Sequence, residues 1–255
     1  MPRAAGADAT KVFAQTLDRG LQILELVAHA PDAVTLSQAA AAIDVHRTVA
    51  YRLAATLVTR GYLRREESGG YRLGSTCLAL AAAVSDLRSL ARPLLEDLAK
   101  TTNETVHLVV VSGQDVVFID GIESDQALRV ASRTGRRLPA HATSVGKAWL
   151  AALDADRLHQ IYPNEELPQI TARTLDTRAD LERVLATVRR LGHATSNGES
   201  ESGVGSIGVA ICDRAGTPRA AISVAMPLGR FTPEARRVAT EALSTTAEGL
   251  ALRLA

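Results

Sequence analysis

The sequence predicts an α+β protein, with a small helical N-terminal domain and a larger domain in which an antiparallel sheet is flanked by helices. Two patterns carry this prediction. Three helical patterns and one hairpin fill the first 74 residues, and short β-branched runs alternate with helical patterns after them. The chain has 255 residues, 46% of them hydrophobic, which is enough for two cores. We expect a frayed N-terminus over 1–13, the small domain over 14–74, a connecting helix over 75–90 and the larger domain over 91–255.

The composition excludes several classes of protein. A net charge of +1 does not suggest a protein that coats nucleic acid. No apolar run reaches the roughly 18 residues of a membrane helix, and the first 18 residues lack the apolar stretch of a secretory signal. Two cysteines are too few for a disulfide framework. We therefore expect a reduced, cytoplasmic, globular protein with no membrane association.

The small domain begins with three helical segments. In the first, leucines at helical spacing run from Leu17 to Leu24, and Pro31 ends the segment. Thr35 or Ser37 can cap the second, which runs through Ala39 to Ile43. A tight turn at Asp44 and Val45 leads into the third, expected from Arg47 to about Thr59. Its buried face is expected to consist of residues four apart: Val45, Val49, Leu53 and Leu57.

A hairpin follows the third helix. Gly61 is a good helix stop, and Gly69-Gly70 separates two short runs, 62–65 and 71–73, that read as strands. Three helices followed by a hairpin are typical of a winged helix-turn-helix domain. The third helix of such a domain fits the DNA major groove.

The predicted third helix exposes side chains suited to DNA. Arginine offers a bidentate fork to guanine, and threonine offers a hydroxyl and a methyl group. The hairpin adds two arginines for phosphates, and the start of the second helix can anchor a phosphate on its amides. The predicted DNA-binding residues are Ser37, Gln38, His46, Arg47, Thr48, Tyr51, Arg52, Arg64 and Arg65. The alternative is a three-helix domain whose exposed arginines have no partner, and Glu66 and Glu67 at the hairpin tip argue against deep insertion of the wing.

The order of these motifs resembles the IclR family of bacterial transcriptional regulators. Residues 17–26 look like its opening helix, 47–53 like its recognition helix, and 61–63 with 70–74 like its wing. Residues 141–148 and 221–224 are similar to motifs of its effector domain. The resemblance runs from about residue 14 to the end, and its specificity comes from five motifs in order. It implies an effector domain similar to GAF-type sensor folds.

The segment after the wing is rich in alanine and leucine and apolar on more than one side. The resemblance implies that this linker helix, over 75–90, helps two subunits associate. A helix packed only within its own chain is the alternative. Arg92-Pro93 is expected to kink or restart the helix, because proline fits a first helical turn.

The larger domain shows strand and helix patterns in alternation. Gly113, Gly121 and the turn at 213–216 separate short runs, and Pro233 marks the first turn of a last helix. Strands are expected over 106–111, 116–119, 128–131, 205–212 and 219–225, and helices over 144–153, 177–191 and 232–252.

No catalytic or cofactor constellation emerges from the sequence. Gly203 to Gly208 spells G-x-G-x-x-G, but a polar loop precedes it and a strand follows it. A dinucleotide-binding site needs a strand before this motif and a helix after it. The six histidines show no metal spacing with cysteines or acids. We expect no cofactor, no metal and no enzyme activity. Enzymatic turnover of a bound ligand, with His141 or Glu199 as base, is the alternative.

The resemblance implies a small-molecule pocket in the larger domain. The start of the 144–153 helix presents free amides and the positive end of the helix dipole, which favours a carboxylate. Where some relatives place an acid, a thiol and two hydroxyls, this chain has Ser196, Ser206, Ser223 and Ala225, so it departs at three of four positions and leaves the ligand's identity open. The expected effector residues are Leu128, His141, Ser144, Val145, Ser196, Ser206, Ser223 and Ala225. A serine bonded only to backbone is the alternative at each strand position.

These observations predict a sequence-specific DNA-binding regulator, and more specifically a repressor, controlled by a small carboxylate metabolite. Because symmetric dimers match symmetric half-sites, we expect a homodimer or homotetramer on a near-palindromic operator of double-stranded DNA. A helix-turn-helix that binds protein instead of DNA is a further alternative.

Overall fold

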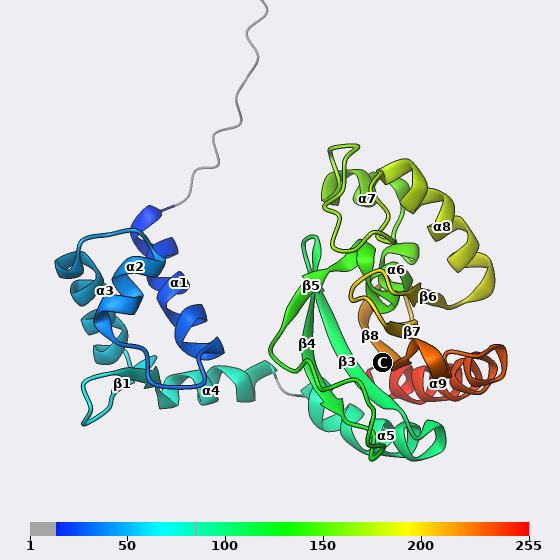
Figure 1. The fold of residues 1–255 in the computed structure, drawn as a ribbon, viewed down its shortest axis with the longest axis horizontal. Helices are drawn as coiled ribbons and strands as arrows, with labels where there is room; N and C mark the ends of the chain where they lie inside the picture. Colours follow the sequence, from blue (N-terminus) through cyan, green and yellow to red (C-terminus); the bar gives the residue numbers. More distant parts are fainter. Residues whose placement is uncertain (1–13, 85, 255) are drawn as a thin grey trace, which may run out of the picture. The chain divides into compact units, whose positions relative to one another are not determined.

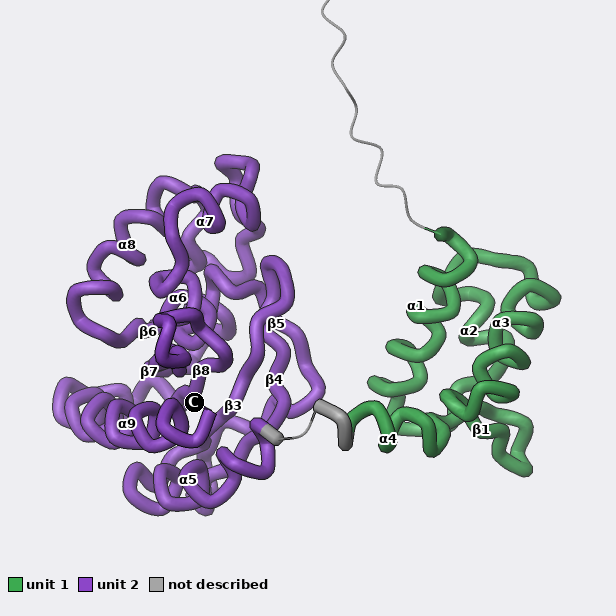
Figure 2. Tube along the Cα trace, turned by 180° about the vertical axis from the view of Figure 1, so that it is seen from behind, with its two compact units in different colours: residues 1–85 green, residues 86–255 purple. Residues whose placement is uncertain are grey.

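The computed structural model describes residues 14–84 and 86–254, so the frayed N-terminus expected over 1–13 lies outside the described residues. The chain divides into two compact units, residues 1–85 and residues 86–255 (Figure 2). Each unit has its own core. None of the described helices is long and apolar enough to span a membrane.

The first unit is a winged helix-turn-helix, as predicted. It contains α1 (Gln15–His29), α2 (Leu36–Ala42), α3 (Arg47–Thr59) and the antiparallel hairpin of β1 (Leu63–Arg65) and β2 (Tyr71–Leu73). Thr35 caps α2 in a reciprocal arrangement with Gln38, and Asp44 takes a positive φ of 48° in the turn before α3. The core is formed by Ile23, Val27, Val34, Ala39, Ile43, Ala54, Leu63 and Tyr71.

The buried face of α3 differs from the prediction. Ala50 and Ala54 are fully buried, whereas Val49 is 40% exposed, and Leu53 and Leu57 are only partly buried. A repeat of four residues drifts by about 40° per step around a helix of 3.6 residues per turn, so Val49, Leu53 and Leu57 cannot share one angular position on α3. The narrow alanine face lets α3 pack closely on the rest of the unit.

Within the segment expected as one helix over 75–90, the described residues on both sides of residue 85 are helical. α4 spans Ser75–Val84, and α5 spans Asp86–Thr102. Of the kink or restart expected at Arg92-Pro93, the restart is wrong, because Pro93 lies inside α5. Ala91 and Leu95 on either side of it are fully buried, and this packing holds the helix through a residue that cannot donate a backbone hydrogen bond.

The second unit is built on one six-stranded antiparallel sheet, in the spatial order β5-β4-β3-β8-β7-β6. Two central strands, β8 and β3, join the outer pairs. The strands are β3 (Thr105–Ser112), β4 (Asp115–Ile122), β5 (Arg137–Pro139), β6 (Ala194–Asn197), β7 (Val204–Cys212) and β8 (Pro218–Pro227). This confirms the predicted α+β class.

Helices cover both faces of this sheet (Figure 1). Alternation along β7 and β8 sends Ile207 and Val224 into a core with α5 and α9 (Pro233–Arg253). The opposite face carries small side chains and packs against α6 (Ser144–Ala151) and, beyond it, α8 (Arg178–Leu191). We call this opposite face the inner face of the sheet.

Among the α-helices and strands of the second unit, α7 (Ala155–Ile161), β5 and β6 were not predicted. The strand expected over 128–131 is wrong, because this segment belongs to a loop between β4 and β5. Side chains organise the loop in place of a strand ladder. The Glu123 carboxylate accepts from the Ser132 amide and from Arg129, and Thr105 Oγ1 donates to the Val130 carbonyl.

Candidate nucleic-acid interface and effector site

The N-terminal half of α3 presents a polar surface. Arg47, Thr48, Tyr51 and Arg52 are all exposed, and none of the three charged or phenolic groups has a side-chain partner among the described residues. His46 caps the helix: its Nδ1 accepts a hydrogen bond from the Thr48 amide at 3.3 Å. The cap occupies one His46 nitrogen, so this residue orients the helix start as well as adding to its surface.

A groove of about 590 Å³ runs between the start of α2, the start of α3 and the hairpin. Arg47 and Tyr51 line it from α3, Ser37 lines it from α2, and Arg65 lines it from β1. Four predicted residues from three elements thus meet at one surface.

The two wing arginines have different surroundings. Arg65 pairs across the hairpin with Tyr71, on the side that faces the groove. Arg64 points to the other side, where Glu66 Oε1 lies 2.5 Å from its guanidinium. Because that carboxylate neutralises Arg64, the structure distinguishes two residues that the sequence treats as equal.

Ser37 and Gln38 both lie exposed in the first turn of α2. The Gln38 backbone N–H donates to Thr35 Oγ1, and the Gln38 side-chain oxygen Oε1 accepts from the Thr35 backbone N–H at 2.8 Å. The capping box therefore occupies one of the amides expected to anchor a phosphate.

On the inner face, the start of α6 meets the strands. Ser144 Oγ lies 2.8 Å from Ser206 Oγ on β7, and Ser196 Oγ on β6 donates to the Ala142 carbonyl at 3.2 Å. Thr143 caps α6 by accepting from the Gly146 amide. Val145 is buried in the same turn.

The strand register adds the remaining inner-face residues. Ser206 pairs with Ala225, and Gly208 two residues along pairs with Ser223. Directly paired residues project to the same face of a sheet. Six predicted effector residues therefore gather on the inner face: Ser144, Val145, Ser196, Ser206, Ser223 and Ala225.

The other two predicted effector residues lie elsewhere in the unit. His141 is buried, its Nε2 is 2.9 Å from the Pro168 carbonyl, and burial lowers its pKa. Leu128 is 69% exposed in the β4–β5 loop. It lines a pocket of about 340 Å³ together with Arg129, Arg133, Arg136 and Glu201.

Sequence reasoning missed the charged and aromatic groups beside this pocket. Arg133 is only 7% exposed, and its guanidinium carbon lies 5.9 Å from the Phe118 ring centre. The His107 ring packs against the Phe118 ring in a T-shaped arrangement, with 5.1 Å between the ring centres. Burial, followed by the charge of Arg133, lowers the pKa of His107 to about 3, so its imidazole is neutral at physiological pH. No motif marks these residues in the sequence.

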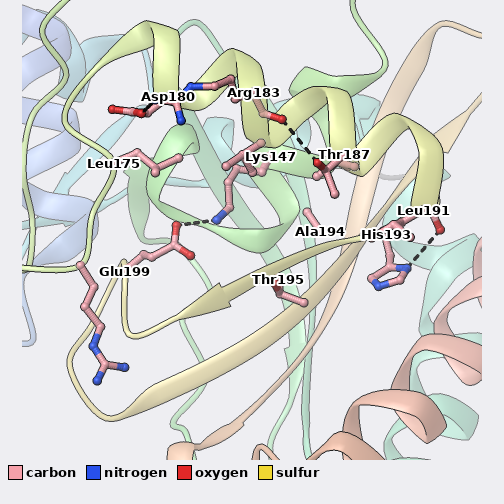
Figure 3. Close-up of a pocket in the computed structure, with 13 residues that line it drawn as sticks. Lys147, Leu175, Asp180, Arg183, Thr187, Leu191, His193, Ala194, Thr195 and Glu199 are labelled. Atoms are coloured by element: carbon pink, nitrogen blue, oxygen red, sulfur yellow. Dashed lines mark hydrogen bonds and ion pairs between the residues drawn. The ribbon is translucent and has the colours of Figure 1, made fainter.

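A second pocket of the unit, about 530 Å³, lies between α6, α8 and β6 (Figure 3). Lys147 on α6 and Glu199 point toward one another at its base and form an ion pair. Lys147 is 2% exposed, and burial lowers the pKa of its ammonium group. Thr171 and Thr174 bond the backbone of Glu199 and fix the carboxylate's position. Across the described residues, no cluster of histidine, cysteine and acidic side chains is arranged to hold a metal ion.

Comparison with known proteins matches both units to one family. The model for the "IclR helix-turn-helix domain" matches residues 16–67, and the model for "Bacterial transcriptional regulator IclR C-terminal" matches residues 79–252. The chain is 33% identical over 216 residues to the transcriptional regulator KdgR of Escherichia coli K12, covering 83% of this chain and 82% of that one. It is 29% identical over 239 residues to the transcriptional repressor IclR of the same strain, covering 91% and 87%.

A solved structure is similar over the same extent. The IclR homologue of Microbacterium hydrocarbonoxydans, crystallised with 4-hydroxybenzoate, is 27% identical with a TM-score of 0.79, and the match covers 92% of this chain and 98% of that one.

Proposed function

The chain belongs to the IclR family of bacterial transcriptional regulators, and from that membership we propose that it is a sequence-specific repressor released from its operator by a small carboxylate. Members of this family are DNA-binding regulators with an effector-binding C-terminal domain, not enzymes. We assign DNA binding to residues 14–74, subunit association to the linker over 75–90, and effector binding to residues 91–255.

The groove shared by Arg47, Tyr51 and Arg65 is the observation that carries the DNA-binding assignment. Unpaired guanidinium groups at the start of an exposed helix suit base edges in the major groove. Arg65 on the wing suits the neighbouring phosphates. Thr48 and Arg52 extend the base-reading surface, and Ser37, Gln38, His46 and Arg64 lie at its border.

Association of subunits is supported by the apolar surface of α4. This helix is rich in alanine and leucine, and within its own chain it leaves Leu78 74% exposed and Leu80 52% exposed. Exposed apolar surface of this kind is stabilised by covering it. A second copy of the chain placed on α4 gives the two winged domains that a near-palindromic operator requires. A tetramer is a pair of such dimers.

The inner face of the second unit supports effector binding. Its strands carry serine, alanine and glycine, and Ser206 is only half-buried. Hydroxyls beside a helix start suit a small carboxylate or hydroxy acid. The Microbacterium hydrocarbonoxydans homologue was crystallised with 4-hydroxybenzoate, a carboxylate. This supports the same chemical class here.

Effector binding acts by favouring one arrangement of the two winged domains over another. The coupling free energy equals the difference between the effector's affinities for the two arrangements, typically about 1–3 kcal/mol.

Selection of binding sites from a random duplex pool by the full-length protein tests the proposal. We expect enrichment of a near-palindrome, and release of the selected duplex by members of a carboxylate panel. Enrichment without symmetry would contradict the dimer. Absence of any enrichment at low salt would favour a helix-turn-helix that binds protein.

A further inference from the structure

Arg133 is a nearly buried cation with a single side-chain partner. Its Nη2 lies 2.5 Å from Glu201 Oε2, and this is the one side-chain hydrogen bond that Arg133 makes within the described parts of the chain. A guanidinium has five N–H donors in a planar fork that fits a carboxylate with two parallel hydrogen bonds. The single bond to Glu201 leaves this capacity largely unused.

The two members of this ion pair differ sharply in burial. The Arg133 side chain is 8% exposed, whereas the Glu201 side chain is 57% exposed. Phe118 supports the guanidinium from below, and Glu201 comes from the loop before β7, where Gly203 has a φ of +90°. The cation is therefore fixed, and its counter-ion is the member that can leave.

The pocket beside Arg133 opens at the end of the inner face. Val204 and Pro227 line this pocket and pair with one another. One step along the same face is the pair of Ser206 and Ala225, because successive residues on one face are two apart. Arg133 therefore lies at the edge of the inner face, to which we assign effector binding.

A buried histidine with one unpaired ring nitrogen lies close enough to Arg133 to feel its charge. His107 is 1% exposed, its Nε2 has no hydrogen-bond partner, and its register partners are Ser223 on β8 and Gly121 on β4. A buried polar atom without a partner costs about 1–3 kcal/mol, and a ligand hydroxyl can relieve that cost.

We propose that Arg133 is the carboxylate-binding residue of the effector site, and that Glu201 occupies it in the ligand-free protein as an internal carboxylate that the effector displaces. This inference rests on the proposed function and specifies its ligand chemistry. The effector's carboxylate takes the place of the Glu201 carboxylate on the guanidinium. Its remaining polar group reaches toward His107 and Ser223. Displacement frees the loop that carries Glu201.

Chemical rescue with acetate tests this exchange without knowledge of the natural effector. In full-length Glu201→Ala, thermal unfolding is followed against sodium acetate, with sodium chloride at equal ionic strength as reference. We expect a saturable rise in Tm with acetate over chloride, and an acetate Kd about tenfold lower than in wild type, because the internal competitor is absent.

Three double variants serve as controls. Arg133→Gln with Glu201→Ala should show no difference between acetate and chloride. Arg133→Lys with Glu201→Ala keeps a cation at the site and should fold, but should bind acetate more weakly because the fork is lost. Arg137→Gln with Glu201→Ala, which removes an arginine outside the pocket, should be rescued as fully as the single variant.

Equal acetate and chloride curves in Glu201→Ala would overturn the inference, as would full rescue after Arg133 is replaced by either residue. The proposed function fails separately. If wild type still releases selected DNA in response to a carboxylate while rescue is absent, the regulator stands and Arg133 does not bind the ligand. If rescue occurs but no duplex is selected, the carboxylate site stands and the regulator does not.

Discussion

The Ser144 hydroxyl lies 2.8 Å from the Ser206 hydroxyl, which joins the first residue of α6 to strand β7 of the sheet. Ser144 is buried and Ser206 half-buried, so the bond lies at the boundary of the inner face. Ser206→Ala should lower the free energy of unfolding by about 1 kcal/mol, the usual contribution of one hydrogen bond. Urea unfolding measures the difference. A loss above about 3 kcal/mol would mean that Ser206 holds more than this one contact.

Gly208 sets how closely α6 approaches the sheet. A Cβ atom at this position would lie 2.6 Å from both the Ser144 carbonyl carbon and the Val145 nitrogen, which are backbone atoms that cannot rotate away. Gly208→Ala should therefore displace the start of α6 and cost about 1–3 kcal/mol of stability.

Gly216→Ala is unsuitable as a control because Gly216 has a positive φ, whereas Gly229→Ala meets no atom within 4 Å. Thermal unfolding of Gly208→Ala and Gly229→Ala side by side checks the prediction. Equal melting temperatures would show that the packing of α6 on the sheet does not require a glycine at position 208.

The ion pair of Lys147 and Glu199 should be costly to break from one side. Lys147→Met leaves the Glu199 carboxylate, 14% exposed, without its cation, and loss of one partner of a buried pair costs about 3–5 kcal/mol. Adding Glu199→Gln removes the unpaired charge and should recover part of this loss. Denaturant unfolding of the single and double variants measures both changes. A double variant no more stable than Lys147→Met would show that the unpaired Glu199 charge does not cause the loss of stability.

Much of this architecture could be predicted from the sequence because local patterns determine it. The observed limits of α3 agree with the expected span from about Arg47 to Thr59, since a turn at Asp44 and Val45 and a stop at Gly61 flank it. The hairpin followed from Gly69 and Gly70. The buried face of α3 could not be read from a repeat of four, because its closest contacts use Ala50 and Ala54 rather than the larger residues.

What the sequence did not predict depends on tertiary contacts. β6 is a four-residue edge strand that pairs with β7, and its small and polar residues give no apolar alternation to predict it from. Pro93 stays helical because residues around it are buried. Arg133, His107 and Glu201 come from three separate segments and form a group only when the sheet and its loops are folded. The inner-face serines were placed by family resemblance, and no spacing rule marks them.

Stability should depend on pH through His107. Burial lowers its pKa from 6.5 to about 3 in the folded chain, so below pH 6.5 the unfolded chain binds a proton that the folded chain does not. Stability is therefore lost as the pH falls from about 6.5 to about 3, with a slope of about 1.4 kcal/mol per pH unit from this residue.

The variant His107→Gln isolates this contribution. Its free energy of unfolding, followed from pH 7 to pH 4, should fall less steeply than that of wild type by about that slope. Parallel curves for the two proteins would contradict a neutral, buried His107.

The DNA-reading role of α3 is tested most directly by the affinity of Arg47→Ala for the selected operator and for a scrambled duplex, in a gel-shift titration at fixed salt. Arg60→Ala, an exposed arginine at the end of the same helix, is the matched control. We predict that Arg47→Ala weakens operator binding by about 1–3 kcal/mol and narrows the preference over the scrambled duplex, while Arg60→Ala changes neither. Operator affinity and preference in Arg47→Ala that match wild type would contradict the central claim that this face of α3 reads DNA.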